Sequence, residues 1–214
     1  MSTIVHLVRH GEVFNPDRIL YGRLPGYHLS DRGRAMASTT ARAFTGHDVT
    51  VLKASPLTRA QETAQPFQQV TGLDIVTDDE LIEAGNDLEG YRIKGWRSQL
   101  WNPTLWHHLK EPMRPSWGEP YQDICDRMWA AVGRAREEAR GHEAIMVSHQ
   151  LPIVMIQRDY AGKRLAHNPA VRQCSLASVT SLIFDDDTVV RSGGPAAVRA
   201  QVNDLAYSEP AQRV

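Results

Sequence analysis

The residues of this chain best suited to chemistry are Arg9 and His10, followed by Gly11 at the end of a short apolar segment. The segment Ile4–Val8 is predicted to be a buried strand, after which Gly11 allows the backbone to turn sharply. In an open α/β sheet, ligands bind at the carboxyl ends of the strands, where His10 would lie. A neutral imidazole there can attack a phosphoryl group while the adjacent guanidinium binds its oxygens. The triplet alone could arise by chance, so its weight depends on further motifs.

Two more basic residues follow predicted strands in the same way. Arg59 would lie in the first turn of a helix, where backbone amides already favour anions. Because an arginine opposes the helix dipole at that position, a bound anion explains it better than helix stability does. His149 directly follows the apolar segment Ala144–Ser148. Taken singly, Arg59 could be an exposed charge and His149 a polar cap, but with His10 they predict a cluster of histidines and arginines around one oxyanion.

An acidic residue could complete this site. Phosphoryl transfer that expels an alkoxide needs a proton donor for the leaving oxygen. Glu83 has apolar neighbours on both sides, so it can be partly desolvated, and its pKa would then rise toward neutral pH. The alternative is that Glu83 is a surface acid in an acidic loop.

The remaining pattern predicts the elements that would position these residues. Strands are expected at Ile4–Val8, Val49–Ala54, Ala144–Ser148 and Val179–Phe184, with a weaker candidate at Leu73–Val76. Helices are expected at Asp31–Phe44, Leu57–Val70, Tyr121–Arg140 and Pro152–Ala161. This alternation predicts an α/β fold with three layers, α/β/α, around a mostly parallel central sheet. Val179–Phe184 and Thr188–Arg191 read as a hairpin, which would add an antiparallel edge strand.

We expect residues 1–192 to form a single domain, with a helical cap inserted at about residues 91–128 and a partly disordered tail at residues 193–214. The cap contains Trp96, Trp101, Trp106 and Trp117, divided by prolines. These tryptophans either fill a small core or line a substrate pocket.

Composition limits the classes of function. The formal net charge is −1 for 214 residues, which gives no electrostatic argument for binding nucleic acid or an anionic membrane. No apolar run approaches the length of a membrane span, and the N-terminus lacks the features of a secretory signal. The two cysteines have no metal-ligand spacing. We therefore expect a cytoplasmic protein with reduced thiols.

The motifs together resemble the histidine phosphatase superfamily, in its phosphoglycerate mutase-like branch. They occur in that family's order, and the resemblance extends from about Ile4 to Phe184. The matching motifs are Arg9-His10-Gly11-Glu12, Leu29-Ser30-x-x-Gly33, Ser55-Pro56-Leu57-x-Arg59-Ala60-x-x-Thr63-Ala64 and Ser148-His149. Gly118-Glu119 also resembles the family's Gly-Glu-Ser element, with Pro120 in place of the serine.

The resemblance implies a role for each matching residue. His10 would be the nucleophile that becomes phosphohistidine, and Glu83 the general acid and then the base. Arg9, Arg59 and His149 would bind the transferring phosphoryl group. Asn15 resembles a phosphate-contacting asparagine one residue nearer the histidine than usual, and Tyr21, Gly22 and Arg23 match a loop that approaches substrate. No metal or other cofactor is implied, because the arginines neutralise the phosphoryl charge.

Several points stay open. The segment after Glu83 is one residue short and lacks the family's aromatic residue, so Glu80 or Glu89 could be the acid instead. The leading function is hydrolysis of a small-molecule phosphomonoester. The alternatives are a phosphoglycerate mutase, although the cap lacks the mutases' arginine pair, and an inactive phosphate- or phosphoprotein-binding module. The sequence does not identify the substrate, and the edge hairpin could pair across a homodimer.

Overall fold

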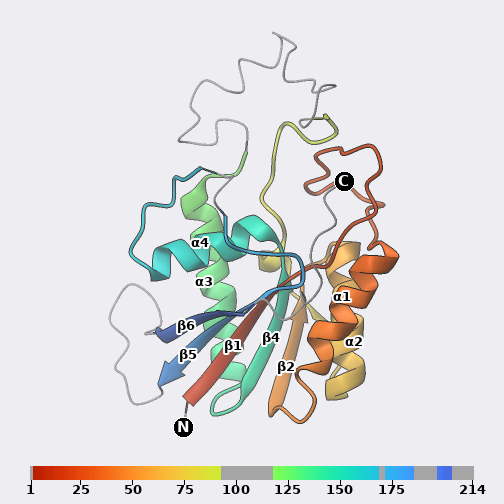
Figure 1. The fold of residues 1–214 in the computed structure, drawn as a ribbon. Helices are drawn as coiled ribbons and strands as arrows, with labels where there is room; N and C mark the ends of the chain where they lie inside the picture. Colours follow the sequence, from red (N-terminus) through yellow and green to blue (C-terminus); the bar gives the residue numbers. More distant parts are fainter. Residues whose placement is uncertain (1, 93–117, 169–171, 186–196, 204–214) are drawn as a thin grey trace.

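The computed structural model describes residues 2–92, 118–168, 172–185 and 197–203 (Figure 1). One sheet contains β1 (Ser2–Arg9), β2 (Val49–Ala54), β3 (Val76–Thr77), β4 (Glu143–Ser148), β5 (Val179–Asp185) and β6 (Ala197–Asn203). The helices are α1 (Asp31–Arg42), α2 (Thr58–Thr71), α3 (Tyr121–Glu138) and α4 (Gln150–Tyr160), with a short 3₁₀ helix at Asp79–Leu81. The long predicted elements are therefore confirmed to within a few residues at their ends.

The sheet is mixed, as predicted. Its strands lie in the order β3-β2-β4-β1-β5-β6. Neighbours from β3 to β1 are parallel, whereas β5 runs antiparallel to β1 and β6 antiparallel to β5. The carboxyl ends of β1, β2 and β4 consequently meet at one edge, which is the edge where the sequence places its basic residues.

Helices cover both faces of the sheet and form two separate cores (Figure 1). Val5 and Leu7 of β1 pack with α3 and α4 in one core, while Val8 packs with α1 and α2 in the other. The same alternation occurs in β4, where Met146 and Ile145 belong to opposite cores. A strand buried on both faces explains why these segments read as continuous apolar runs.

Two expected strand positions differ in the structure. On the side away from β1, β5 pairs with β6, at Ala197–Asn203. The expected partner, Thr188–Arg191, lies outside the described residues. The segment expected to be a partly disordered tail thus contributes an edge strand. The weaker candidate Leu73–Val76 is also misplaced, because only Val76 and Thr77 pair with β2, while Leu73 and Ile75 pack against a core.

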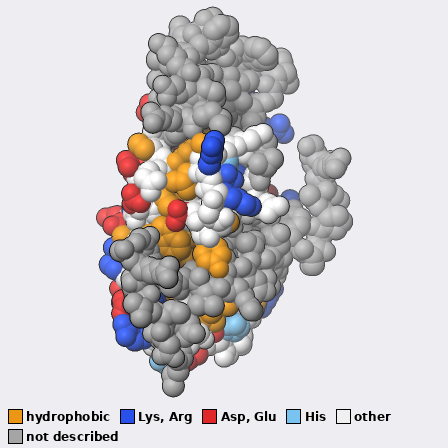
Figure 2. All heavy atoms as spheres, turned by 90° about the vertical axis from the view of Figure 1, so that its left-hand side faces the viewer, with side chains coloured by type: hydrophobic (Ala, Val, Ile, Leu, Met, Phe, Trp, Pro, Cys, Tyr) orange, Lys and Arg blue, Asp and Glu red, His pale blue; other side chains and the backbone are white. Residues whose placement is uncertain are grey.

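The predicted cap falls mostly outside the described part of the chain, which resumes at Gly118 after Arg92, so the four cap tryptophans are outside it as well. The side of the molecule toward α3 and α4 mixes hydrophobic, basic and acidic side chains (Figure 2). Among the described helices, none combines the length and apolarity needed to cross a membrane.

The start of α1 packs directly against the backbone that follows β1. Ser30 caps the helix by accepting a hydrogen bond from the Gly33 N–H, as its position before the helix predicts. A Cβ on Gly33 would lie 2.0 Å from the Glu12 carbonyl oxygen, and a Cβ on Gly11 would lie 2.5 Å from the Gly33 carbonyl oxygen. Two backbones can approach this closely only without side chains, so both glycines help to place His10.

We therefore expect Gly33→Ala to lower the free energy of unfolding by about 1–3 kcal/mol, because neither backbone can move away without disturbing the turn after β1. Urea unfolding measures this change. Gly133→Ala is the matched control, since a Cβ there meets nothing within 4 Å and the α3 helix should gain about 0.5–1 kcal/mol. Equal stability of Gly33→Ala and the wild type would contradict the proposed close packing.

Candidate active site

His10 lies at the centre of the candidate site. Its backbone N–H donates to the Ser148 carbonyl across 3.0 Å, which continues the pairing of β1 with β4. The residue is only 2% exposed. Its Nδ1 lies 2.8 Å from the carbonyl oxygen of Gly11. Because a carbonyl only accepts, the proton must reside on Nδ1, which leaves the lone pair of Nε2 available for attack.

His149 lies beside His10, with 5.1 Å between the ring centroids. Its Nε2 is held by the Ser55 hydroxyl at 2.7 Å. Thr63, from the same sequence motif as Ser55, accepts a hydrogen bond from the Gly11 N–H at 3.1 Å. The motif that follows β2 thus orients both the second histidine and the turn that carries the first.

Two arginines bring positive charge to these histidines. Arg59 lies in the first turn of α2, as predicted, and is almost fully buried. Burial lowers the pKa of His10 well below its ordinary value, and the charges of Arg59 and then Arg9 lower it further. The pKa of His149 is lowered in the same way, mainly by burial. Both imidazoles are therefore neutral at physiological pH.

Three buried nitrogen atoms around the histidines have no hydrogen-bond partner among the described residues. They are Nε of Arg9, Nε of Arg59 and Nδ1 of His149. One further nitrogen of each guanidinium binds the protein: Nη2 of Arg59 donates to the Gly22 carbonyl at 2.7 Å, and Nη1 of Arg9 donates to the Cys174 carbonyl at 2.6 Å. Buried nitrogen atoms without a partner are rare in folded proteins, and these three belong to residues that the sequence predicts around one oxyanion.

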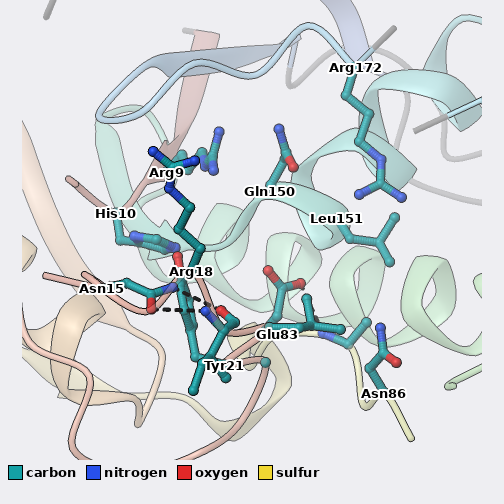
Figure 3. A pocket seen from close by; sticks show the side chains of 14 residues that line it. Arg9, His10, Asn15, Arg18, Tyr21, Glu83, Asn86, Gln150, Leu151 and Arg172 are labelled. Carbon is teal, nitrogen blue, oxygen red and sulfur yellow. Dashed lines mark hydrogen bonds between the residues drawn. The ribbon is translucent and has the colours of Figure 1, made fainter. Parts of the chain in front are cut away.

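A cavity of about 380 Å³ opens next to His10 (Figure 3). The residues that line it are Arg9, His10, Asn15, Arg18, Ile19, Leu20, Tyr21, Gly22, Glu83, Ala84, Asn86, Gln150, Leu151 and Arg172. Arg59 and His149 are not among them and lie buried beside its lining residues. The charged groups of the lining are arginines with one carboxylate, so the cavity suits an anion better than a metal cation.

Glu83 is the acid that the structure brings to this cavity. Its carboxylate points into the space between His10 and Arg172 (Figure 3). Burial raises the pKa of Glu83, whereas the Ala84 N–H, 2.9 Å from Oε1, and the nearby arginines act in the opposite direction. Neither Glu80 nor Glu89 lines the cavity; Glu80 pairs with Arg134, and Glu89 accepts from the Arg23 backbone N–H.

A network of ions holds the loop that carries Glu83. The guanidinium of Arg23 donates to the Glu83 carbonyl at 2.7 Å and to the Glu119 carboxylate at 2.8 Å. Arg127 of α3 binds the other oxygen of Glu119 at 2.8 Å. The Glu119 N–H also donates to the Gly85 carbonyl. Glu119, from the Gly-Glu element of the sequence, is therefore the anchor of this loop.

The residues that the resemblance implies as further substrate contacts differ in whether they line the cavity. Arg23 is not among the lining residues, because its guanidinium is engaged by the Glu83 carbonyl and by Glu119. Gly22 lines the cavity and offers its carbonyl to Arg59. Asn15 also lines the cavity, but its amide closes a turn through two hydrogen bonds with the backbone of Ile19.

Four polar lining residues were not identified from the sequence: Arg18, Asn86, Gln150 and Arg172. Gln150 could have been found, since it follows His149 at the start of α4. Tyr21 packs under the Arg59 guanidinium, 4.8 Å from ring centroid to Cζ. Arg172 binds His167 through Nε at 2.9 Å, in a segment with no local pattern that indicates a site.

Comparison with known proteins assigns the chain to a family. Residues 5–192 match the model of the histidine phosphatase superfamily, branch 1. The chain is 48% identical to the uncharacterized protein Rv0525 of Mycobacterium tuberculosis over 98% of both sequences. It is 30% identical to the probable phosphoglycerate mutase GpmB of Shigella boydii, over 89% of this chain and 92% of that protein.

A solved structure of the mycobacterial glucosyl-3-phosphoglycerate phosphatase Rv2419c has a similar fold. It superimposes with a TM-score of 0.71 over 95% of this chain and 98% of that chain, at 20% sequence identity. The similarity concerns the arrangement of the layers and strands.

The electrostatic argument for His10 predicts a measurable titration. Because its pKa is lowered by burial and by two arginines, His10 should still be neutral at pH 6.5, where an ordinary histidine is half protonated. Nitrogen NMR of the imidazole rings reports this directly. Arg59→Met removes one positive charge and should raise the pKa of His10; an unchanged titration in this variant would show that Arg59 does not act on His10.

Proposed function

Because this chain belongs to branch 1 of the histidine phosphatase superfamily, we propose that it is a metal-independent phosphatase that hydrolyses a small phosphomonoester through a phosphohistidine intermediate. The observation that carries the proposal is the state of His10. It is neutral, its proton is held on Nδ1 by the Gly11 carbonyl, and it lines a cavity together with Arg9 and Glu83. These positions are those that a nucleophile, an anion-binding group and a proton donor for phosphoryl transfer would need.

The first half of the reaction transfers the phosphoryl group to the protein. Nε2 of His10 forms a bond to phosphorus while the bond from phosphorus to the leaving oxygen breaks. Arg9, Arg59 and the neutral His149 stabilise the charge on the phosphoryl oxygens. Glu83, kept protonated by its raised pKa, donates its proton to the leaving oxygen.

The second half returns His10 to its initial state. Glu83, now a carboxylate, accepts a proton from water, and the water oxygen attacks phosphorus. The bond from phosphorus to Nε2 breaks, which releases inorganic phosphate and leaves Glu83 protonated again. Dividing hydrolysis into these steps replaces one difficult displacement by two easier ones.

The cavity supports a small-molecule substrate. Its volume of about 380 Å³ lies within the range found for small-ligand pockets. Leu20, Ala84 and Leu151 give it an apolar side, while Arg172 and Gln150 can contact polar groups of the part that leaves.

Phosphoglycerate mutase activity is the second candidate, and the relative named as a probable phosphoglycerate mutase favours it. A mutase would use the same phosphohistidine but return the phosphoryl group to its substrate. The cap sequence Lys110-Glu111-Pro112-Met113-Arg114 has no pair of adjacent arginines to hold a carboxylate, which favours hydrolysis. An inactive binding module would have no need for the nucleophile His10.

We expect the wild type to hydrolyse p-nitrophenyl phosphate in EDTA and His10→Ala to lose at least about a thousandfold in kcat/KM, because the covalent pathway is removed. Rapid quenching with labelled substrate should trap an acid-labile, base-stable phosphoryl group on the wild type and on the control variant, but not on His10→Ala. His142→Gln is the control, since His142 is an exposed histidine paired with Asp48. Activity that survives in His10→Ala would refute the mechanism.

The same assay distinguishes the two candidate reactions. With 3-phosphoglycerate, a phosphatase releases inorganic phosphate, whereas a mutase accumulates 2-phosphoglycerate. Interconversion of the phosphoglycerates faster than phosphate release would favour the mutase.

Glu83→Gln should lower kcat/KM for an alkyl phosphate by about 10²–10⁴-fold, and that for p-nitrophenyl phosphate much less, because an alkoxide needs a proton and nitrophenolate needs little. In the wild type, the rate with the alkyl phosphate should fall as pH rises through the raised pKa of Glu83. The rate should persist below pH 6.5, since the pKa of His10 is lowered. In Glu83→Gln, the rate of the phosphorylation step, measured by single turnover, should no longer decrease as the pH rises. An equal loss of kcat/KM with the alkyl phosphate and with p-nitrophenyl phosphate would contradict proton donation by Glu83.

A further inference from the structure

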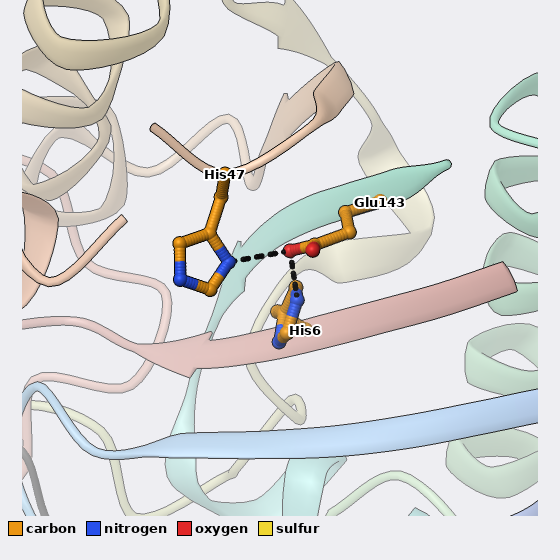
Figure 4. Close-up of side chains that lie close together, drawn as sticks. All are labelled: His6, His47 and Glu143. Carbon is orange, nitrogen blue, oxygen red and sulfur yellow. Dashed lines mark hydrogen bonds and ion pairs between the residues drawn. The ribbon is translucent and has the colours of Figure 1, made fainter. Parts of the chain in front are cut away.

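A second cluster of chemically competent side chains lies away from the cavity. It consists of His6 of β1, His47 of the segment between α1 and β2, and Glu143 at the start of β4 (Figure 4). Nε2 of His6 and Nδ1 of His47 each lie 2.9 Å from the same oxygen, Oε2 of Glu143. All three potential ligand atoms lie within 4.8 Å of one another.

The cluster is at the opposite end of the strands from the candidate active site. His6 precedes His10 by four residues, about 13 Å along an extended strand at 3.3 Å per residue. Glu143 begins the strand that His149 follows. No residue of the cluster lines the cavity, so its chemistry is independent of the proposed phosphatase reaction.

Two of the three side chains are fixed by the sheet. His6 is buried, with its Nδ1 2.8 Å from the Ser181 hydroxyl of β5 and its ring edge-on to Phe44 at 4.9 Å between centroids. The 2.9 Å contact with Glu143 is a hydrogen bond that Nε2–H donates to the carboxylate, while Nδ1 accepts from the Ser181 hydroxyl. When a metal ion takes the place of the proton on Nε2, Nδ1–H can donate to the same hydroxyl, which leaves the lone pair of Nε2 for the metal. Hydrogen-bonded histidines of this kind are usual among metal ligands, because the second bond fixes the ring orientation.

From this geometry we propose that His6, His47 and Glu143 form a binding site for a divalent transition metal such as Zn²⁺. Two imidazoles and a carboxylate are ligands that Zn²⁺ binds at about 2.0–2.2 Å, with a further position open to water. In a tetrahedral site of that size, ligand atoms are about 3.3 Å apart, so the two 2.9 Å contacts need to lengthen by only a few tenths of an ångström.

His47 can supply the remaining movement, which would bring its Nδ1 to about 3.3 Å from Nε2 of His6, since all three ligand atoms now lie within 4.8 Å of one another. The side chain of His47 is 42% exposed and lies in the connection between α1 and β2, so it can rotate toward the metal without disturbing the core. Its exposure also gives the ion a path from solvent. The bound metal would join β1, β4 and the segment before β2, which are three separate parts of the chain.

The test is zinc binding by the full chain after EDTA treatment and desalting, in competition with a chromophoric chelator. The wild type should bind one Zn²⁺ at least tenfold more tightly than either His47→Gln or Glu143→Gln, because each variant removes a ligand. His142→Gln is the matched control, since His142 is also exposed but pairs with Asp48 and should leave this affinity unchanged. Comparing variants also separates this site from zinc bound at His10 and His149.

Two further measurements make the result unambiguous. At a hundredfold excess over its dissociation constant, Zn²⁺ should raise the Tm of the wild type by about 5 °C or more, and this rise should be lost in His47→Gln. Co²⁺ in place of Zn²⁺ should give visible bands without thiolate charge transfer, as expected for nitrogen and oxygen ligands. In EDTA the variants should have a Tm close to that of the wild type, which shows that they fold. Zinc binding equal in the wild type, His47→Gln and Glu143→Gln, or absent from all three, would overturn the proposal.

Discussion

The parallel pairing of β1 with β4 is the constraint on which the candidate site depends. Its register places Arg9 opposite Ser148, and one further backbone hydrogen bond joins the His10 N–H to the Ser148 carbonyl. Because both strands end at the same level, the residues that follow them, His10 and His149, lie ring against ring. A shift of one residue would turn one side chain to the opposite face of the sheet, so the two histidines depend on this register.

The buried charges around this pair of histidines destabilise the folded state. Arg59 is 1% exposed, and it lies with Arg9 close to two neutral histidines and one carboxyl group whose pKa is raised. Buried positive charge without a full complement of anions is destabilising on its own. The tight backbone contact between Gly11, Glu12 and Gly33, and the hydrogen bonds of Ser55 and Thr63, hold the groups in place against that cost. Such preorganisation allows a site to stabilise an anion without rearrangement.

Glu83 is positioned by side-chain contacts, and not by the end of a strand as the histidines are. Glu83 follows the short 3₁₀ helix rather than a strand of the sheet, so its loop must be held by side chains. Ser148 donates to the Leu81 carbonyl at one end of the loop, and Arg23 and Glu119 hold it from the other side. The site therefore joins a rigid part, built on strand ends, with an acid whose place depends on an ion network between distant segments.

Local sequence pattern was sufficient for the strands, the helices and the residues at strand ends. Continuous apolar runs and three-to-four spacing depend on neighbouring residues alone, so Ile4–Val8 and its counterparts could be read directly, and His10, Arg59 and His149 followed from their positions after them. The order of the strands, the partner strand β6, the bracing of Glu83 by Glu119, and the approach of Arg172 to the cavity depend on residues far apart in the chain. The same holds for His6, His47 and Glu143, because they meet only through the pairing of β1 with β4 and the return of the chain into β2. Contacts across a sheet carry no local periodicity, and for that reason only the folded structure decides them.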